Sequence, residues 1–173
     1  MSKTYSKTRI LVECALMIAI GTVLSNIKFF TLPNGGSVTL LSMLPFVLVS
    51  FRHGVKWGLF TGFVNGCLQM LLGFWAPPTP TFLYFLGEVL LDYLVAYTAL
   101  AVGGFFKGKA WGIFPCVSLG CLGRFAVHYF SGVTLYRILE PTGIEGLEGF
   151  GVFANPHVYS LVYNGVYMLP NVI

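Results

Sequence analysis

The chain has 173 residues, of which 56% are hydrophobic and 9% are charged, and its mean hydropathy is +0.80. Soluble domains usually carry about 25% charged residues, so this composition excludes a soluble domain and predicts an integral membrane protein. The net charge of +4 is concentrated in short clusters at the ends of apolar segments. Because no basic face is interleaved with aromatic residues, nucleic acid is not an expected partner.

The first apolar segment, approximately residues 10–27, follows a short basic N-terminus. No small-residue cleavage site lies near its end, so it predicts a spanning helix and not a cleavable signal peptide. Ala15 and Ala19 lie one helical turn apart in this segment. Two small residues at this spacing flatten one strip of a helix and let another helix approach closely. Glu13 is expected to reach toward water from the same helix.

Five more apolar segments follow, at approximately residues 38–51, 55–72, 82–106, 110–135 and 158–173. A spanning helix needs about 20 apolar residues, so the second and third segments are short, and their tight connector favours a helical hairpin. The last segment has no polar residue to close it, and we expect the sequence to stop short of the end of that helix. The prediction is one all-α membrane domain over residues 1–173, a bundle of six transmembrane helices.

The basic residues predict the orientation of this bundle. With six spans, the N-terminus and the second and fourth connectors share one side of the membrane, and cytoplasmic connectors carry an excess of Lys and Arg. We therefore expect both termini in the cytoplasm. The basic residues on that side are Lys3, Lys7, Arg9, Arg52, Lys56, Lys107 and Lys109, against Lys28 and Arg137 on the other.

Polar side chains occur inside the last three segments. An Asp or Arg at the centre of a spanning helix costs about 2.5–3.5 kcal/mol on insertion scales, and such residues usually face the bundle interior or a wet cavity. Each segment holds a pair of these groups four residues apart, which places the pair on one helix face, so the three stripes are predicted to converge on one pocket. They are Glu88, Asp92 and Tyr93 in the fourth segment, Arg124 and His128 in the fifth, and Tyr159, Tyr163 and Asn164 in the sixth.

Two interpretations of these groups are open from the residues alone. In the first, Asp92 and Arg124 pair to join two helices, with His128 bonded nearby. In the second, the groups form a small-molecule site with a carboxylate for a cation, aromatic faces for a flat ring, and His and Asn for directional hydrogen bonds. Both can hold together if Arg124 is structural and the other groups contact the ligand.

Over nearly its whole length the chain resembles the substrate-binding S components of energy-coupling factor (ECF) vitamin transporters, in particular the thiamine-specific ones. The resemblance depends on an ordered set of motifs at matching intervals. They are Ala15 and Ala19 in the first helix, "LPNGGSVTLLSMLPFVLVSFRHG" at 32–54, "LLDYLVAYTALAVGGFF" at 90–106, "HYFSGV" at 128–133 and "YSLVYNG" at 159–165.

The resemblance implies which residues contact thiamine. A buried carboxylate and aromatic faces suit the permanent positive charge of the thiazolium ring, and Asn, His and Tyr suit the aminopyrimidine. Glu88 is added to this set without a counterpart in the family pattern; it could pair with Arg124, hold a water, or touch the hydroxyethyl tail. The implied positions are Asp92, Tyr93, His128, Tyr136, Tyr159 and Asn164, with Gly132 beside them.

The chain departs from the family pattern at two aromatic positions. Some members have a stacking Trp in the first external connector, where this chain has Gly36, so Phe29, Phe30 or Trp75 would have to take that role. Where some members have Trp after the glycine of the fifth helix, this chain has Tyr136.

The resemblance also implies a division of labour. An S component captures thiamine outside a bacterial cytoplasmic membrane, and transport requires a membrane T component and two ATPase subunits. The chain has no GxxxxGK[ST] loop for ATP, which agrees with that division. Ala15 and Ala19 would then form the surface that docks on the T component. No cofactor, metal or catalytic residue is expected.

Three alternatives remain at this stage. The chain could be an S component for another flat vitamin or for hydroxymethylpyrimidine, a thiamine precursor. It could be a small intramembrane enzyme that uses Glu88, Asp92 and His128 as metal ligands or acid–base groups, although no HExxH pair is present. It could also be a scaffold whose polar groups only join helices.

Overall fold

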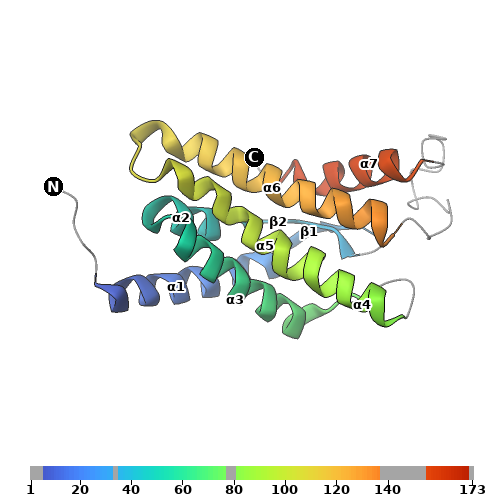
Figure 1. The fold of residues 1–173 in the computed structure, drawn as a ribbon, viewed down its shortest axis with the longest axis horizontal. Helices are drawn as coiled ribbons and strands as arrows, with labels where there is room; N and C mark the ends of the chain where they lie inside the picture. The colour runs from blue at the N-terminus through green and yellow to red at the C-terminus, as the bar shows by residue number, and fades with distance from the viewer. Residues whose placement is uncertain (1–5, 33–34, 77–80, 137–154, 172–173) are drawn as a thin grey trace.

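The structure is a computed structural model, which describes residues 6–32, 35–76, 81–136 and 155–171. Most of this part of the chain is helical, and its long helices run side by side along the longest axis of the molecule (Figure 1). The elements are α1 (Lys7–Asn26), β1 (Lys28–Thr31), β2 (Ser37–Thr39), α2 (Leu44–His53), α3 (Val55–Gly73), α4 (Phe82–Glu88), the π-helical turn η2 (Val89–Val95), α5 (Ala96–Ala99), the 3₁₀ segment η3 (Leu100–Phe106), the 3₁₀ turn η4 (Ala110–Gly112), α6 (Ile113–Thr134) and α7 (Pro156–Met168).

The four elements from α4 to η3 form one continuous helix, Phe82–Phe106, which we call the fourth helix. Each predicted apolar segment therefore contains a helix, and the described part of the chain is a six-helix bundle, as expected. Within it, three helices are long and apolar enough to cross a membrane: Lys7–Asn26, Phe82–Phe106 and Ile113–Thr134. By contrast, α2 has 10 residues and α7 has 13, fewer than the about 20 that a span needs.

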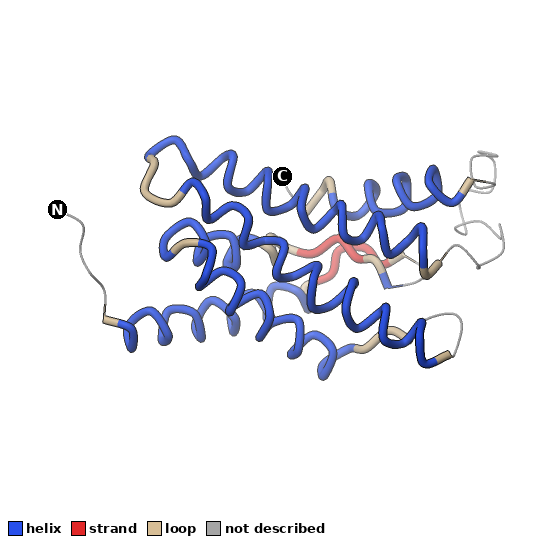
Figure 2. The backbone as a smooth tube through the Cα atoms, viewed as in Figure 1, coloured by secondary structure: helices blue, strands red, loops and turns tan. Residues whose placement is uncertain are grey.

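The second segment was predicted to be helical over residues 38–51, and its first half is not. Strands β1 and β2 pair antiparallel, with Phe30 opposite Val38, and α2 begins only at Leu44 (Figure 2). Pro45 lies in the first turn of α2, where a missing N–H is tolerated and the fixed φ suits a helix. The predicted connector is thus a β-hairpin; its residues 33 and 34 lie outside the described part of the chain.

Two other predicted boundaries also differ. The last helix was predicted over residues 158–173, but α7 begins at Pro156, after Asn155 caps its N-terminus, and ends at Met168. Most of the long connector before it, residues 137–154, is outside the described residues, as is Arg137. The other external connector is described up to residue 76.

Small residues let α3 pack closely against the fourth helix. Gly58, Gly62 and Gly66 are buried at intervals of four residues. A Cβ at Gly62 would lie 2.5 Å from the carbonyl oxygen of Tyr97, and one at Gly66 would lie 2.8 Å from that of Tyr93. Backbone therefore meets backbone along this face, the arrangement that small residues at helical spacing allow in membrane bundles. From the sequence, a small-residue strip was predicted only in α1.

We expect Gly62→Ala to destabilise the protein by about 1–3 kcal/mol, the usual effect of adding a group to a filled interface. Gly73→Ala at the end of the same helix is the matched control, because nothing lies within 4 Å of a Cβ at that position. Thermal unfolding of the purified protein in detergent measures both. Equal melting temperatures for the two variants would contradict the close approach of α3 to the fourth helix.

Apolar side chains fill the part of the bundle away from the hairpin. Three of the four cysteines are buried, and all four are free, as expected for small hydrophobic residues. The core contains no charged side chain. This core consists of Ile18, Met43, Phe46, Val47, Leu100, Cys116 and Cys121.

Glu13 does not reach freely toward water, contrary to the prediction. Its carboxylate lies 3.0 Å from Arg52 Nη1 and 3.0 Å from His53 Nε2, and 16% of the side chain is exposed. The Lys107 ammonium donates to the His53 carbonyl at 3.0 Å. These contacts tie the first turns of α1 to the ends of α2 and the fourth helix, at the end of the bundle opposite the hairpin.

Candidate functional site

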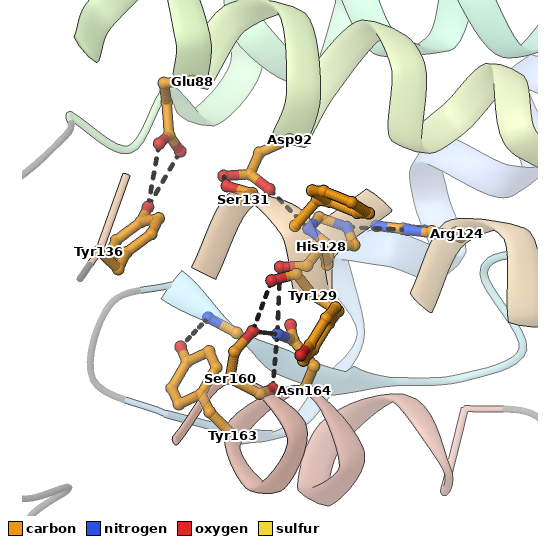
Figure 3. Close-up of polar contacts among 12 residues, drawn as sticks. Glu88, Asp92, Arg124, His128, Tyr129, Ser131, Tyr136, Ser160, Tyr163 and Asn164 are labelled. Carbon is orange, nitrogen blue, oxygen red and sulfur yellow. Dashed lines mark hydrogen bonds and ion pairs between the residues drawn. The ribbon is translucent and has the colours of Figure 1, made fainter. Parts of the chain in front are cut away.

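A cavity of about 250 Å³ lies at the hairpin end of the bundle, just below the range of about 300–1,000 Å³ that is usual for small-molecule sites. Its walls come from the hairpin, the fourth helix, α6, α7 and the ends of α1 and α3. The polar stripes of the last three helices therefore converge, as predicted from their spacing (Figure 3). All seven predicted ligand-binding residues line this cavity: Glu88, Asp92, Tyr93, His128, Tyr136, Tyr159 and Asn164.

Asp92 is the centre of a hydrogen-bond chain that crosses from the fourth helix to α6. His128 Nδ1 lies 2.7 Å from Asp92 Oδ1, and the Ser131 hydroxyl donates to Oδ2 at 2.6 Å. Arg124 Nε donates to His128 Nε2 at 3.3 Å. Since arginine can only donate, Nε2 must be the acceptor, and this assigns the ring proton to Nδ1, which donates to Asp92. The imidazole is then neutral, and Asp92 keeps its negative charge.

Asp92 and Arg124 therefore do not form the direct ion pair that one interpretation of the sequence proposed. His128 lies between them. The guanidinium carbon of Arg124 lies 4.3 Å from the centre of the Tyr97 ring, a cation–π contact that holds it against the cavity wall. Arg124 is a structural residue in this arrangement, and His128 both joins the helices and lines the cavity.

The backbone around Asp92 departs from an α-helix. Residues Val89–Val95 form a π-helical turn, which contains one extra residue relative to an α-helical turn and is common at functional sites. Asp92 and Tyr93 lie inside it. The carbonyls of Tyr93 and Tyr97 face the glycines of α3, so the widened turn lies against the part of the bundle where backbones approach most closely.

Tyr93 lines the cavity, but its hydroxyl is used to shape the wall. The Trp75 N–H donates to Tyr93 Oη at 2.7 Å, and that hydroxyl donates to the Gly73 carbonyl at 3.3 Å. The Tyr93 ring stacks on Phe74 at 5.6 Å between centroids. These contacts hold the turn that follows α3 and place Trp75 at the cavity, where it packs over Gly35.

Of the three aromatic residues named as substitutes for a missing stacking residue, only Trp75 is in position. Phe29 and Phe30 lie on β1 with 68% and 55% of their surface exposed, and neither lines the cavity within the described residues. Tyr159 and Tyr163 stack on each other at 5.7 Å with an angle of 22° between their rings, so α7 supplies a second aromatic wall.

Asn164 holds α7 against α6. Its amide nitrogen donates to the carbonyls of His128 and Ser160, at 3.2 and 2.9 Å, and its oxygen accepts from the Tyr167 hydroxyl at 2.9 Å. The Ser160 hydroxyl in turn donates to the Tyr129 carbonyl at 2.8 Å. Asn164 is 4% exposed, so its amide fixes the helix pair.

Glu88 lies one turn before Asp92 and does not contact Arg124, which removes one of its three possible roles. The Tyr136 hydroxyl lies 3.1 Å from both oxygens of the Glu88 carboxylate, and Glu88 is 2% exposed. Burial, and then the nearby carboxylate of Glu88, raises the pKa of Tyr136. Its hydroxyl therefore remains protonated and donates to Glu88.

Several residues of the cavity wall were not predicted from the sequence. Ser131 follows His128 by three residues and so shares its helix face, a spacing that could have identified it. Tyr167 in α7 and Asn171 just after it continue the four-residue spacing of Tyr159 and Tyr163, which was an equally readable signal. Asn171 accepts from the Thr39 N–H at 2.7 Å and donates to the Ser37 carbonyl at 3.0 Å, so it attaches β2 to the end of α7.

Known proteins resemble this chain in both sequence and fold. The family described as "Thiamine transporter protein (Thia_YuaJ)" matches residues 11–173. Thiamine transporter ThiT of Bacillus subtilis (strain 168) is 34% identical over 178 residues, which cover 94% of this chain and 84% of that protein. ThiT of Lacticaseibacillus paracasei is 26% identical over 174 residues, covering 90% and 77%.

Among solved structures, ThiT from Listeria monocytogenes matches with a TM-score of 0.75 at 23% identity, covering 96% of this chain and 88% of that one. At this identity the likeness shows a shared fold. The family match and the B. subtilis relative go further, because each extends over nearly the whole chain. This chain belongs to the thiamine transporter family.

Proposed function

We propose that this protein is the thiamine-binding S component of an ECF-type importer, which captures thiamine outside the cell for ATP-driven uptake. The observation that carries the proposal is the cavity, where an anionic Asp92, a neutral His128 and the aromatic residues of α7 meet in a chain of this family. The family is one of transporters, and we assign no catalytic residue.

The chemistry of thiamine suits this cavity. The thiazolium ring carries a permanent positive charge, and Asp92 offers a carboxylate that is already held by two hydrogen bonds. A buried carboxylate that is already held in place can bind a cation without a further free-energy cost of reorganisation. We assign the flat faces of Tyr159, Tyr136 and Trp75 to ring contacts. We assign the ring face of His128 and the remaining lone pair of the Asn164 oxygen to the pyrimidine side.

Uptake also requires partners that supply ATP hydrolysis. We propose a T component and two ATPase subunits, and we propose that the T component docks on Ala15 and Ala19 of α1. Both alanines are exposed on this helix, and small residues at this spacing suit a close helix–helix contact. We also propose that the protein lies in the cytoplasmic membrane with both termini in the cytoplasm, following the predicted excess of basic residues there.

Titration of the purified protein with thiamine, hydroxymethylpyrimidine and riboflavin tests the ligand. Trp75 lines the cavity, so tryptophan fluorescence is expected to be quenched when a ligand binds. Thiamine is expected to be the tightest of the three ligands, because it alone carries a permanent positive charge. In Trp75→Phe the quench is expected to be lost while calorimetry still detects binding. Tightest binding of riboflavin would refute thiamine as the substrate, and equal binding of hydroxymethylpyrimidine would identify the precursor as the ligand.

A further inference from the structure

We propose that Glu13 is a positioning residue for partner docking. Its contacts with Arg52 and His53 set the rotation of α1 about its own axis. That rotation decides the direction in which Ala15 and Ala19 face. This inference rests on the proposed function, because it concerns the surface on which the T component docks.

The apolar packing of α1 is too narrow to fix this rotation by itself. The helix runs along one edge of the bundle (Figure 1), and only Cys14, Ile18 and Gly21 of its 20 residues are buried. None of residues 7–13 is buried. Because the buried stripe is about one residue wide, a small turn of α1 about its axis separates few apolar contacts.

Glu13 and Ala15 lie on opposite sides of this stripe. Successive residues of an α-helix are about 100° apart, so Cys14 faces the bundle with Glu13 on one flank and Ala15 on the other. Ala19 follows Ala15 by one turn and shares its flank. A contact that holds the flank of Glu13 therefore fixes the direction of the alanine flank.

Two contacts hold the Glu13 flank against the bundle. One oxygen of the carboxylate lies 3.0 Å from Arg52 Nη1, and the other lies 3.0 Å from His53 Nε2. His53 is 8% exposed at the end of α2, and its carbonyl accepts from the Lys107 ammonium at 3.0 Å. The start of α1 is thereby attached to both α2 and the fourth helix, and the use of both carboxylate oxygens gives the attachment a defined direction.

These contacts supply direction more than stability. The Arg52 side chain is 49% exposed, and ion pairs at such sites contribute little to the free energy of unfolding. Neither Glu13, Arg52 nor His53 is among the described residues that line the cavity, which lies at the other end of the bundle. Loss of the Glu13 carboxylate should therefore impair docking while folding and ligand capture stay nearly unchanged.

The first test separates uptake from binding. In Glu13→Ala, we expect thiamine uptake by the complete transporter in proteoliposomes to fall at least about tenfold, because docking weakens with the fraction of molecules whose alanines face the partner. The purified variant should bind thiamine as the wild-type protein does. The exchange of charges in Glu13→Arg with Arg52→Glu should restore most of the uptake, since it restores the pair. Lys56→Ala, which removes an exposed charge near the start of α3, is the matched control and should keep wild-type uptake.

A distance measurement in the purified protein reports the rotation directly. Spin labels in Leu16→Cys and Leu59→Cys, at positions 58% and 45% exposed on α1 and α3, give one distance by pulsed electron paramagnetic resonance. Cys67 is replaced by serine, because it is the native cysteine that is not buried. The distance distribution should broaden in Glu13→Ala and narrow again when the charges are exchanged.

An unchanged distance distribution in Glu13→Ala, or wild-type uptake by that variant, would overturn the positioning role. Uptake that stays low after the exchange of charges would overturn it as well. So would loss of thiamine binding together with uptake, because the contacts would then support the whole bundle. Failure of the wild-type protein to bind thiamine, or to take it up with the ATPase module, would instead refute the proposed function itself.

Discussion

Asp92→Asn is expected to weaken thiamine binding by about 100-fold or more, because loss of one partner of a buried charge pair commonly costs about 2–5 kcal/mol. Asparagine keeps the size of the side chain and a carbonyl oxygen that can still accept from Nδ1 of His128. What it removes is the negative charge opposite the thiazolium ring. Calorimetric titration of the purified variant measures the loss.

An uncharged analogue separates charge from shape in this experiment. With the thiazolium ring replaced by a neutral thiophene, the same substitution should reduce affinity by no more than about tenfold, the value of a hydrogen bond or so. Ser131→Ala is the matched control, since it removes a donor to Asp92 and leaves the charge; it should affect both ligands alike. Equal losses of both ligands in Asp92→Asn would mean that Asp92 serves to join the fourth helix to α6.

Ala15→Trp combined with Ala19→Trp is expected to abolish thiamine uptake by the complete transporter while leaving thiamine binding unchanged. Both alanines are exposed on α1 and lie outside the cavity wall. Two indole rings would hold a partner helix away from the strip on which close contact depends. Uptake into cells or vesicles that contain the ATPase module measures the first effect, and titration of the purified variant measures the second.

Leu16→Trp combined with Ile20→Trp provides the control for this experiment. These side chains are 58% and 46% exposed on the same helix, and each follows an alanine by one residue, so they point about 100° away from the strip. The control should retain most of the uptake, because it adds the same bulk to the helix but leaves Ala15 and Ala19 unchanged. Undiminished uptake by the alanine variant would remove the strip from the docking mechanism.

The fold was predictable where hydropathy alone determines the outcome. Runs of apolar residues identified all six helices. A chain in lipid must form its backbone hydrogen bonds within itself, and a helix does so in a single segment. The hairpin was missed although "PNGG" is a turn signal and the flanking residues favour strands. Its short strands lie within a stretch apolar enough to resemble the start of a helix.

The residues of the site were more predictable than their contacts. Helical spacing placed Asp92, His128 and Asn164 on converging faces, and their presence at one cavity followed. Spacing could not identify which side chain Asp92 would bond, because a rotation of either helix by a few tens of degrees exchanges Arg124 for His128. Their direct contact with thiamine stays a prediction.

Other features had no local signal. The ion pairs of Glu13 join residues about forty positions apart in sequence, and nothing near Glu13 indicates them. The π-helical turn likewise has no residue signature in the chain. Inside this turn the carbonyl of Tyr93 lies against Gly66 of α3, a contact between two helices that local sequence does not indicate.

That widened turn makes chain length a determinant of the binding chemistry. The turn holds one residue more than the α-helical turn it replaces, so deleting one residue between Glu88 and Ala96 would restore regular α-helical pitch and leave the flanking parts of the helix close to their present orientation. The deletion would instead change the directions of the side chains inside the turn, Asp92 and Tyr93, relative to those on either side. Grafting these side chains onto a regular helix would therefore reproduce the residues without their relative positions at the cavity.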